Sequence, residues 1–168
     1  MTSIPIVSEQ DEILYHKDSH ERDLHNEIMR CSGLWILNEK GEVLIALRSK
    51  NKRSFPNIWG PSVTGSNEEG ETYESNIIKE AEEELGLSIK NPIWGIKERG
   101  SESHEYFVQW FFVTIPSNTQ FVLQESEVDQ VRWISITDLR QWDQKNPEQF
   151  VPLFNTDIDV VENYVNQN

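Results

Sequence analysis

The residues best able to do chemistry are three glutamates near the middle of the chain, Glu80, Glu83 and Glu84. In a helix, spacings of three and four residues place all three carboxylates on one face. Such carboxylates repel each other, and a hard divalent cation that prefers oxygen ligands removes the repulsion. Negative charge near a helix C-terminus also opposes the helix dipole. The spacing favours a metal site, with a solvated acidic face as the alternative interpretation.

A helix over residues 73–85 is the element that would present this face. Thr72 is a suitable N-cap, an acidic residue, Glu74, lies in the first turn, and Gly86 supplies a C-terminal stop. Apolar residues at helical spacing form the adjoining face, which we expect to pack against a sheet. These residues are Ile77, Ile78, Ala81 and Leu85.

The rest of the chain predicts an α+β fold in one domain, residues 1–168. Residues 1–29 are polar and acidic and are expected to form an N-terminal extension, and residues 137–168 to form a helical C-terminal segment. Short apolar or strand-like segments predict strands at 31–37, 43–47, 62–64, 88–97, 104–115 and 131–135.

The overall composition excludes several classes of protein. With 168 residues, 36% hydrophobic and 26% charged, the chain is typical of a globular domain. A net charge of -14 argues against a nucleic-acid partner, which would need a basic face. The apolar stretches are too short to span a membrane. One cysteine and no signal sequence predict a cytoplasmic protein. Nothing in the sequence indicates an oligomeric state.

One basic cluster stands out against this acidic background: Arg48, Lys50, Lys52 and Arg53. We expect Arg48 and Lys50 to contact phosphates of a substrate, with a solvated basic loop as the alternative. Trp59 or Phe55 could stack on a base or cover an apolar group of the same substrate.

Residues 65–87, GSNEEGETYESNIIKEAEEELGL, resemble the Nudix box, in which glycines, glutamates and aliphatic residues recur at fixed positions. The matching positions are Gly65, Glu71, Glu80, Glu83, Glu84, Gly86 and Leu87. Ala81 occupies an aliphatic position, and Lys79 stands where arginine is usual. The resemblance extends more weakly over about residues 10–145.

This resemblance implies an α/β/α sandwich around a mixed sheet and magnesium-dependent hydrolysis of a diphosphate linkage. The substrate would be small and soluble, such as a nucleoside diphosphate derivative. Glu80 and Glu84 would be direct Mg²⁺ ligands, with Mn²⁺ as an alternative ion. Glu83 would contact the ion directly or through water, and a backbone carbonyl at Gly65 would complete the set of metal ligands.

The resemblance also implies a bracing pair and a general base. Glu71 and Lys79 would pair and brace the loop, although lysine lacks the forked geometry of arginine. A further carboxylate would take the proton of the attacking water. Glu83, Glu105 and Glu127 are the candidates, and the sequence does not choose among them.

Outside the Nudix box, this chain resembles one branch of the family especially, the proteins like isopentenyl-diphosphate isomerase. The shared stretch runs through Leu24, His25, Arg48, Trp59 and Gly65. An isomerase needs a proton donor and acceptor on opposite faces of a double bond, and a cysteine supplies one of them in those enzymes.

Two key positions of that branch differ here. Thr64 stands at the cysteine position and Ser66 at the position of a metal-binding histidine. A threonine hydroxyl is too weak an acid to replace a thiol. Cys31 is expected in the core, and His25 in a structural role rather than as a metal ligand. An isomerase and a non-catalytic Nudix-fold binding module remain the alternatives; against the second, the box keeps all its glutamates.

Overall fold

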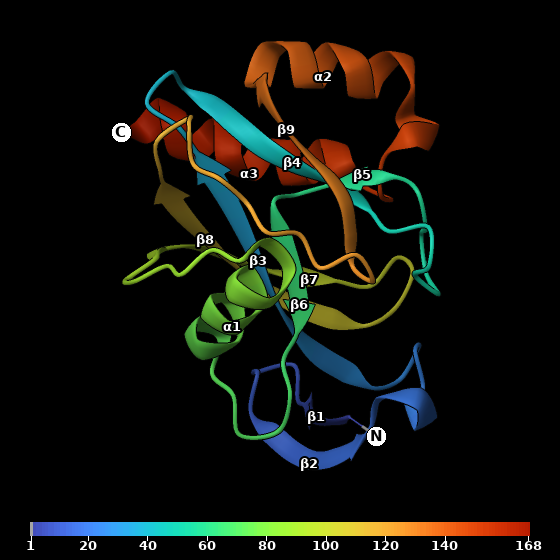
Figure 1. Cartoon of the computed structure of the whole chain (residues 1–168). Coiled ribbons are helices and arrows are strands. Elements are labelled where there is room, and N and C mark those ends of the chain that lie inside the picture. Colours follow the sequence, from blue (N-terminus) through green and yellow to red (C-terminus); the bar gives the residue numbers. More distant parts are fainter. Residues whose placement is uncertain (1) are drawn as a thin grey trace.

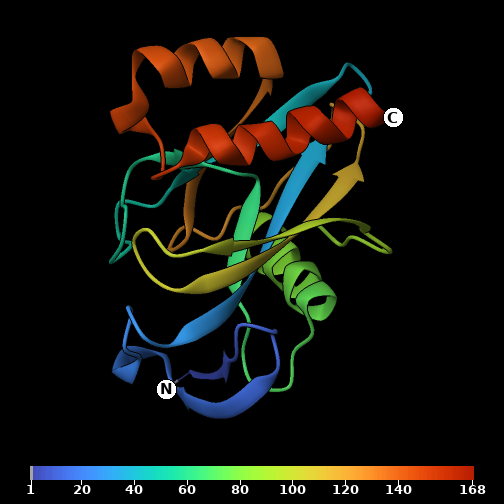
Figure 2. The same ribbon diagram turned by 180° about the vertical axis from the view of Figure 1, so that it is seen from behind.

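The computed structural model describes residues 2–168 as a mixed sheet with helices on both faces (Figure 1; from behind, Figure 2). The strands are β1 Ser3–Val7, β2 Ile13–Asp18, β3 Ile28–Leu37, β4 Glu42–Arg48, β5 Trp59–Gly60, β6 Val63–Ser66, β7 Ile93–Gly100, β8 Tyr106–Thr114 and β9 Val128–Ser135. The helices are α1 Tyr73–Leu85, α2 Ile136–Lys145 and α3 Phe154–Gln167, with 3-10 turns at Ser19–Glu21 and Pro147–Gln149.

Strand β3 organises the sheet because it pairs on both edges. It runs parallel to β8 from Met29, opposite Tyr106, to Leu37, opposite Thr114. On its other edge it is antiparallel to β6, with Cys31 opposite Ser66. Strands β1 and β4 pair with the two ends of β3, and β4 pairs in turn with β9. Parallel and antiparallel pairs in one sheet confirm the predicted α+β class.

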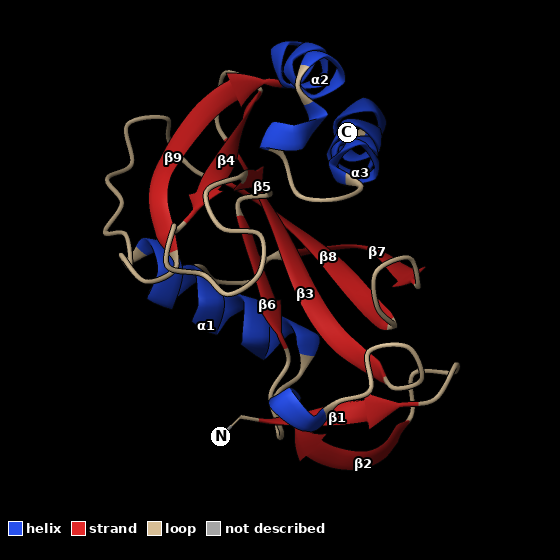
Figure 3. Ribbon diagram, turned by 90° about the vertical axis from the view of Figure 1, so that its right-hand side faces the viewer, coloured by secondary structure: helices blue, strands red, loops and turns tan. Residues whose placement is uncertain are grey.

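Helix α1 covers one face of this sheet, and α2 and α3 cover the other (Figure 3). A hydrophobic core lies on each face. Successive side chains of a strand point to opposite faces. Along β3, Leu34 and Ile36 therefore pack in the core that contains α1, whereas Trp35 and Leu37 pack in the core that contains α2 and α3. The layered α/β/α arrangement predicted from the resemblance is confirmed.

The first 29 residues are not only an extension. Ile4, Ile6 and Val7 of β1 are buried, and β1 pairs with both β2 and β3. Farther along, the strand expected at 88–97 begins only at Ile93, after a loop that contains Pro92. Among residues 2–168, no helix is both long and apolar enough to cross a bilayer.

Helix α1 has the limits that the sequence predicts, because both of its ends are fixed locally. The Ser75 amide donates to the Thr72 hydroxyl at 3.0 Å, and the Thr72 amide donates to the Ser75 hydroxyl at 2.9 Å. This reciprocal capping box satisfies backbone donors at the N-terminus. Gly86 ends the helix with a left-handed φ of 63°. The caps set which residues of α1 face the sheet.

We expect Thr72→Ala to lower the free energy of unfolding by about 1 kcal/mol, because it removes the oxygen that accepts from Ser75. Urea denaturation followed by circular dichroism would measure the change. Thr114→Ala, at an exposed strand end, is the matched control and should leave stability within experimental error. Equal losses in both variants would contradict the capping role.

Candidate functional site

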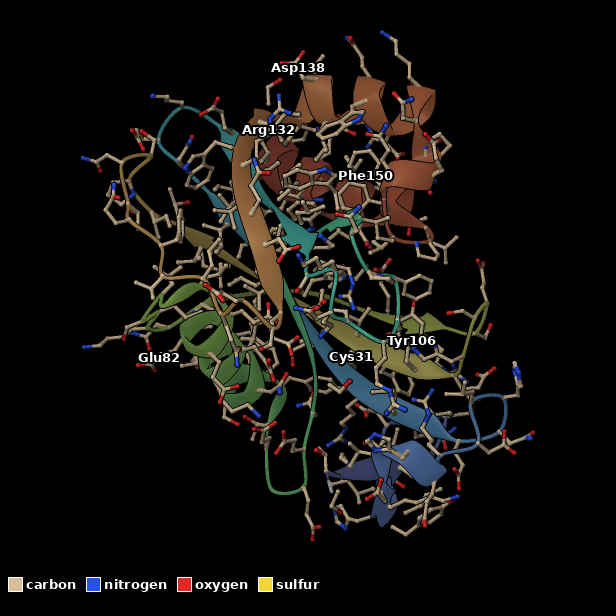
Figure 4. The ribbon with its side chains drawn as sticks, turned by 45° about the vertical axis from the view of Figure 1, so that its right-hand side comes forward. Cys31, Glu82, Tyr106, Arg132, Asp138 and Phe150 are labelled. Carbon is tan, nitrogen blue, oxygen red and sulfur yellow. The ribbon has the colours of Figure 1, made fainter. Side chains whose placement is uncertain are left out.

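A groove beside the acidic face of α1 gathers carboxylates from two parts of the chain. Glu80, Glu83 and Glu84 line it, together with Glu127 from the turn before β9. Its volume is about 470 Å³. Glu82, which lies between Glu80 and Glu83 in the sequence, projects instead from the outer side of α1 (Figure 4). The structure thus brings the three helix glutamates together with one of the two further base candidates.

Glu80 lies against the backbone of β6, and this close approach requires a glycine at position 65. A Cβ atom added to Gly65 would lie 2.6 Å from the Glu80 Cδ atom and 2.9 Å from its Oε1 atom. Such distances are far shorter than ordinary contacts, so any larger residue would displace the Glu80 carboxylate. Gly65 therefore lets Glu80 reach the groove.

Asn76, which the sequence analysis did not identify, helps to hold the same carboxylate. It is fully buried, and its side-chain nitrogen donates to Glu71 at 2.8 Å, to the Ser66 carbonyl at 3.1 Å and to Glu80 at 3.4 Å. Asn76 stands one helical turn before Glu80, on the side of α1 that packs against the sheet. A polar residue on an otherwise apolar helix face was the available signal.

Lys79 braces the loop before α1, as predicted. Its Nζ atom lies 2.7 Å from Glu71 Oε1, 3.3 Å from Glu68 Oε1 and 3.6 Å from Glu80 Oε1. Burial lowers the pKa of Lys79, but the hydrogen bond that Lys79 donates to Glu71 and the nearby charge of Glu80 outweigh burial and raise the pKa above its usual value. The ammonium group is therefore fully charged at neutral pH and offsets part of the local negative charge.

The chain's own cations do not fully compensate the carboxylates of the groove. Burial, with the charges of Glu80 and Glu127, raises the pKa of Glu84 to about 8, although Lys52 and Arg48 oppose the rise. Burial also raises the pKa of Glu80. Both groups would be stabilised as anions by additional positive charge in the groove.

These residues fit a hard divalent cation by donor type and by charge. Every candidate ligand is an oxygen, which is what Mg²⁺ and Mn²⁺ prefer. Within residues 2–168, however, no group of three His, Cys, Asp or Glu side chains lies close enough together to hold a metal ion. Lys79 holds Glu80 and Lys52 pairs with Glu127, so part of the negative charge is engaged by lysines.

The basic loop reaches the groove through Arg48 and Lys52, and Lys50 does not line it. Arg48 Nε donates to the Phe55 carbonyl at 3.0 Å and Nη2 donates to the Ser54 carbonyl at 2.9 Å, which holds the loop at the groove. The Lys52 ammonium pairs with Glu127. Lys50 is exposed, and its backbone amide donates to Asp129. Arg48 therefore lines the groove and Lys50 lies outside it, and contact of either residue with a substrate phosphate stays a prediction.

Three other candidates lie away from the groove. The Glu105 carboxylate pairs with Arg99 and does not line the groove. The Trp59 ring packs on Trp142, with centroids 5.7 Å apart, in the core beneath α2 and α3. His25 is exposed in a turn, where its amide donates to Asp23. The local sequence around Trp59 does not indicate that its ring packs on the distant Trp142.

A cavity of about 480 Å³ continues from the groove into the protein. Arg48, Lys52, Thr64, Glu84 and Glu127 belong to the walls of both hollows, so the two are contiguous. The remaining walls are largely neutral or apolar. They include the aromatic residues Phe55, Tyr106 and Trp110.

Cys31 lines this cavity and is not simply a core residue, which corrects the sequence-based expectation. It lies on β3, next to β8, the strand that carries Tyr106 (Figure 4). Burial raises the pKa of its thiol to about 11, so the thiol is protonated at neutral pH. His104, Tyr106 and Asp157 also line the cavity, and no sequence pattern groups these residues.

Comparison with known proteins agrees with this architecture. The NUDIX domain family matches residues 28–154. The Nudix hydrolase lmo0368 of Listeria monocytogenes is 32% identical over 134 residues, which cover 79% of this chain and 75% of that protein. The isopentenyl-diphosphate Delta-isomerase of Salmonella heidelberg is 42% identical, but over only 55 residues, 33% of this chain and 30% of the isomerase.

Solved structures show the same fold. The DR0079 protein of Deinococcus radiodurans superposes with a TM-score of 0.72 at 23% identity, over 85% of this chain and 89% of that one. A Caenorhabditis elegans Ap4A hydrolase gives a TM-score of 0.61 at 15% identity, over 83% of this chain and 99% of the hydrolase chain. Because the family match covers most of the chain, this protein belongs to the Nudix hydrolase family.

We expect the free energy of unfolding of the metal-free protein to fall between about pH 5 and pH 8. Burial raises the pKa of Glu84 from 4.5 to about 8, so in this window the folded state keeps a proton that the unfolded state has lost. That stabilisation is complete below the unfolded pKa and disappears as the pH rises through the folded pKa.

Glu84→Gln cannot titrate, so its stability should depend less steeply on pH. Urea denaturation in a chelator at several pH values would measure the slopes. Glu82→Gln, on the outer side of the same helix, should keep the slope of the unmodified protein. Identical slopes for all three proteins would show that Glu84 is not the titrating group.

Proposed function

We propose that this chain is a magnesium-dependent hydrolase that cleaves the diphosphate linkage of a small nucleoside diphosphate derivative. Family membership makes it a hydrolase of diphosphate-containing compounds. The observation that carries the finer proposal is the groove, where carboxylates of α1 and Glu127 face Arg48 and Lys52. The cytoplasmic location and the lack of a nucleic-acid or membrane partner remain predictions from the sequence.

Glu80 and Glu84 would hold Mg²⁺, with Glu83 and the Gly65 carbonyl as further ligands and Mn²⁺ as an alternative ion. When bound, the ion would neutralise phosphate oxygens and lower the pKa of bound water. Gly65 and Asn76 support this assignment, because they fix the position of the Glu80 carboxylate.

The residues of the chain account for the remaining requirements of hydrolysis. Water attacks one phosphorus atom, the bridging P–O bond breaks, and one proton of the water passes to a carboxylate. Glu127 and Glu83 are the bases within the groove, whereas Glu105 is paired with Arg99 outside it. Arg48 and Lys52 lie where they can offset phosphate charge. When the substrate binds, Lys52 would leave its ion pair with Glu127 and pair with a phosphate of the substrate.

A structural neighbour and the walls of the cavity both favour a nucleotide as the substrate. A structural neighbour is an Ap4A hydrolase, and Ap4A is a nucleotide derivative. The cavity beyond the groove has aromatic walls, and Phe55 rather than Trp59 is the residue available for stacking at its edge. A planar base fits such walls.

Isomerization of a prenyl diphosphate is the second candidate. Cys31 places a thiol in the cavity, and a 55-residue stretch is similar to isopentenyl-diphosphate isomerases. Thr64, at the position of the isomerase cysteine, also lines the cavity but cannot serve as the acid. Incubation with isopentenyl diphosphate in heavy water, followed by magnetic resonance, separates the candidates. Incorporation of deuterium at the allylic carbon would show that the protein is an isomerase and would overturn the hydrolase proposal.

We expect Glu84→Gln to reduce diphosphate hydrolysis by at least about a hundredfold, because it removes a ligand charge at the reacting phosphate. Formation of the nucleoside monophosphate from a panel of nucleoside diphosphates and their derivatives, with Mg²⁺, would measure the loss. The control is Glu82→Gln, which changes a glutamate of the same helix outside the groove and should keep full activity. Activity of Glu84→Gln within a few-fold of the unmodified protein would rule out this metal site.

Magnesium should raise the melting temperature, and a chelator should reverse the rise, because the ion relieves repulsion among Glu80, Glu84 and Glu127. Thermal unfolding over a series of Mg²⁺ concentrations would show a shift that grows with concentration. Glu84→Gln should weaken this dependence, and Glu82→Gln should retain it. A melting temperature independent of Mg²⁺ up to millimolar concentrations would speak against the site.

A further inference from the structure

The cavity behind the groove is placed to receive the half of the substrate that does not react. Glu84, Glu127 and Lys52 stand where the two hollows meet, so a diphosphate in the groove would direct its other half into the cavity. A volume of about 480 Å³ lies within the range of sites for small organic ligands.

Asp157, in the first turn of α3, is the unusual member of the cavity wall. It is partly exposed, it lines the cavity, and its carboxyl oxygens have no hydrogen-bond partner among residues 2–168. The charged groups that influence it most are both acidic, Glu98 and Asp143. Burial and these two acids raise the pKa of Asp157 well above its usual value.

No basic residue of the described chain pairs with Asp157. The nearby Arg140 is engaged by Asp159 at 2.7 Å and by Glu162 at 2.5 Å. Glu102, another acid, also lines the cavity. This part of the cavity is therefore rich in carboxyl oxygens that can accept hydrogen bonds, in contrast to the end that holds Arg48 and Lys52.

The other walls suit a flat or cationic group. Tyr106, Trp110 and Phe55 present aromatic surface. Aromatic faces attract both stacked rings and cations. An aliphatic chain would fill the same space but would leave the carboxyl of Asp157 buried without a partner, which is costly.

We infer that Asp157 selects the non-phosphate half of the substrate, and that this half carries N–H donors directed at the carboxyl group. An amino-substituted nucleobase such as guanine and an alkylammonium group share this chemistry. The inference rests on the proposed function, because the diphosphate in the groove determines which half enters the cavity. Asp157 acts here as a specificity residue and takes no part in bond cleavage.

The test compares binding of three diphosphates by titration calorimetry with Mg²⁺. Guanosine diphosphate carries a base with adjacent N–H donors, 4-aminobutyl diphosphate carries an ammonium group, and isopentenyl diphosphate carries only hydrocarbon. In Asp157→Leu we expect a loss of about tenfold to a hundredfold in affinity for a nitrogen-bearing ligand, as removal of a hydrogen bond to a charged group predicts. Affinity for isopentenyl diphosphate should stay the same or improve.

Two further variants keep this result interpretable. Asp157→Asn preserves size and polarity and should show a smaller loss, even if Asp157→Leu fails to fold. Asp159→Leu changes an exposed acid of the same helix that pairs with Arg140 outside the cavity, and it should bind all three ligands as the unmodified protein does. A purely structural role of Asp157 would weaken all three ligands equally.

The pattern of losses decides the inference. A loss confined to guanosine diphosphate assigns a nucleobase to the cavity, and a loss confined to the aminobutyl compound assigns an ammonium group; either supports the inference. Equal changes for all three ligands, or tighter binding of isopentenyl diphosphate by the unmodified protein, would overturn it. Hydrolysis is measured separately, so nitrogen-selective binding without phosphate release would refute the proposed function and leave the role of Asp157 intact.

Discussion

Repulsion among the carboxylates of the groove is the constraint on which the rest of the site depends. Glu80 and Glu84 are held against the sheet, where burial disfavours their charged forms. The fold keeps them there by rigid means: both ends of α1 are capped, and a glycine at position 65 admits Glu80. Lys79 and Lys52 offset part of the charge, and the remainder is what a divalent cation would neutralise.

This charge arrangement divides the hollow into two chemical regions. The groove combines carboxylates with Arg48 and Lys52, a combination suited to a cation and a diphosphate. The cavity behind it has aromatic walls and Asp157, an acid whose side chain has no hydrogen-bond partner among residues 2–168, which suits a neutral or cationic donor group. Because β3 pairs with both β6 and β8, it connects the two regions through one continuous sheet. In the proposed complex, the fold would thereby separate the reacting half of the substrate from the half that is recognised.

Elements determined by local interactions could be predicted. Helix α1 has the predicted limits, because its caps and its apolar spacing lie within the segment itself. The pairing of Glu71 with Lys79 was also expected and is present at 2.7 Å. Strand β1 was missed, because its apolar residues are few and become buried only by pairing with β3, more than twenty residues later.

The sequence by itself determined the family, the α+β class and the helix that presents Glu80, Glu83 and Glu84, since a fixed spacing on one helix places side chains on one face. Only the tertiary structure decided which distant residues join them. It brought Glu127 to the groove and paired Glu105 with Arg99. Glu127 pairs with Lys52, 75 residues away in the chain, and Arg99 binds the distant Glu9 as well as Glu105, so the local sequence carries little information about where these glutamates lie.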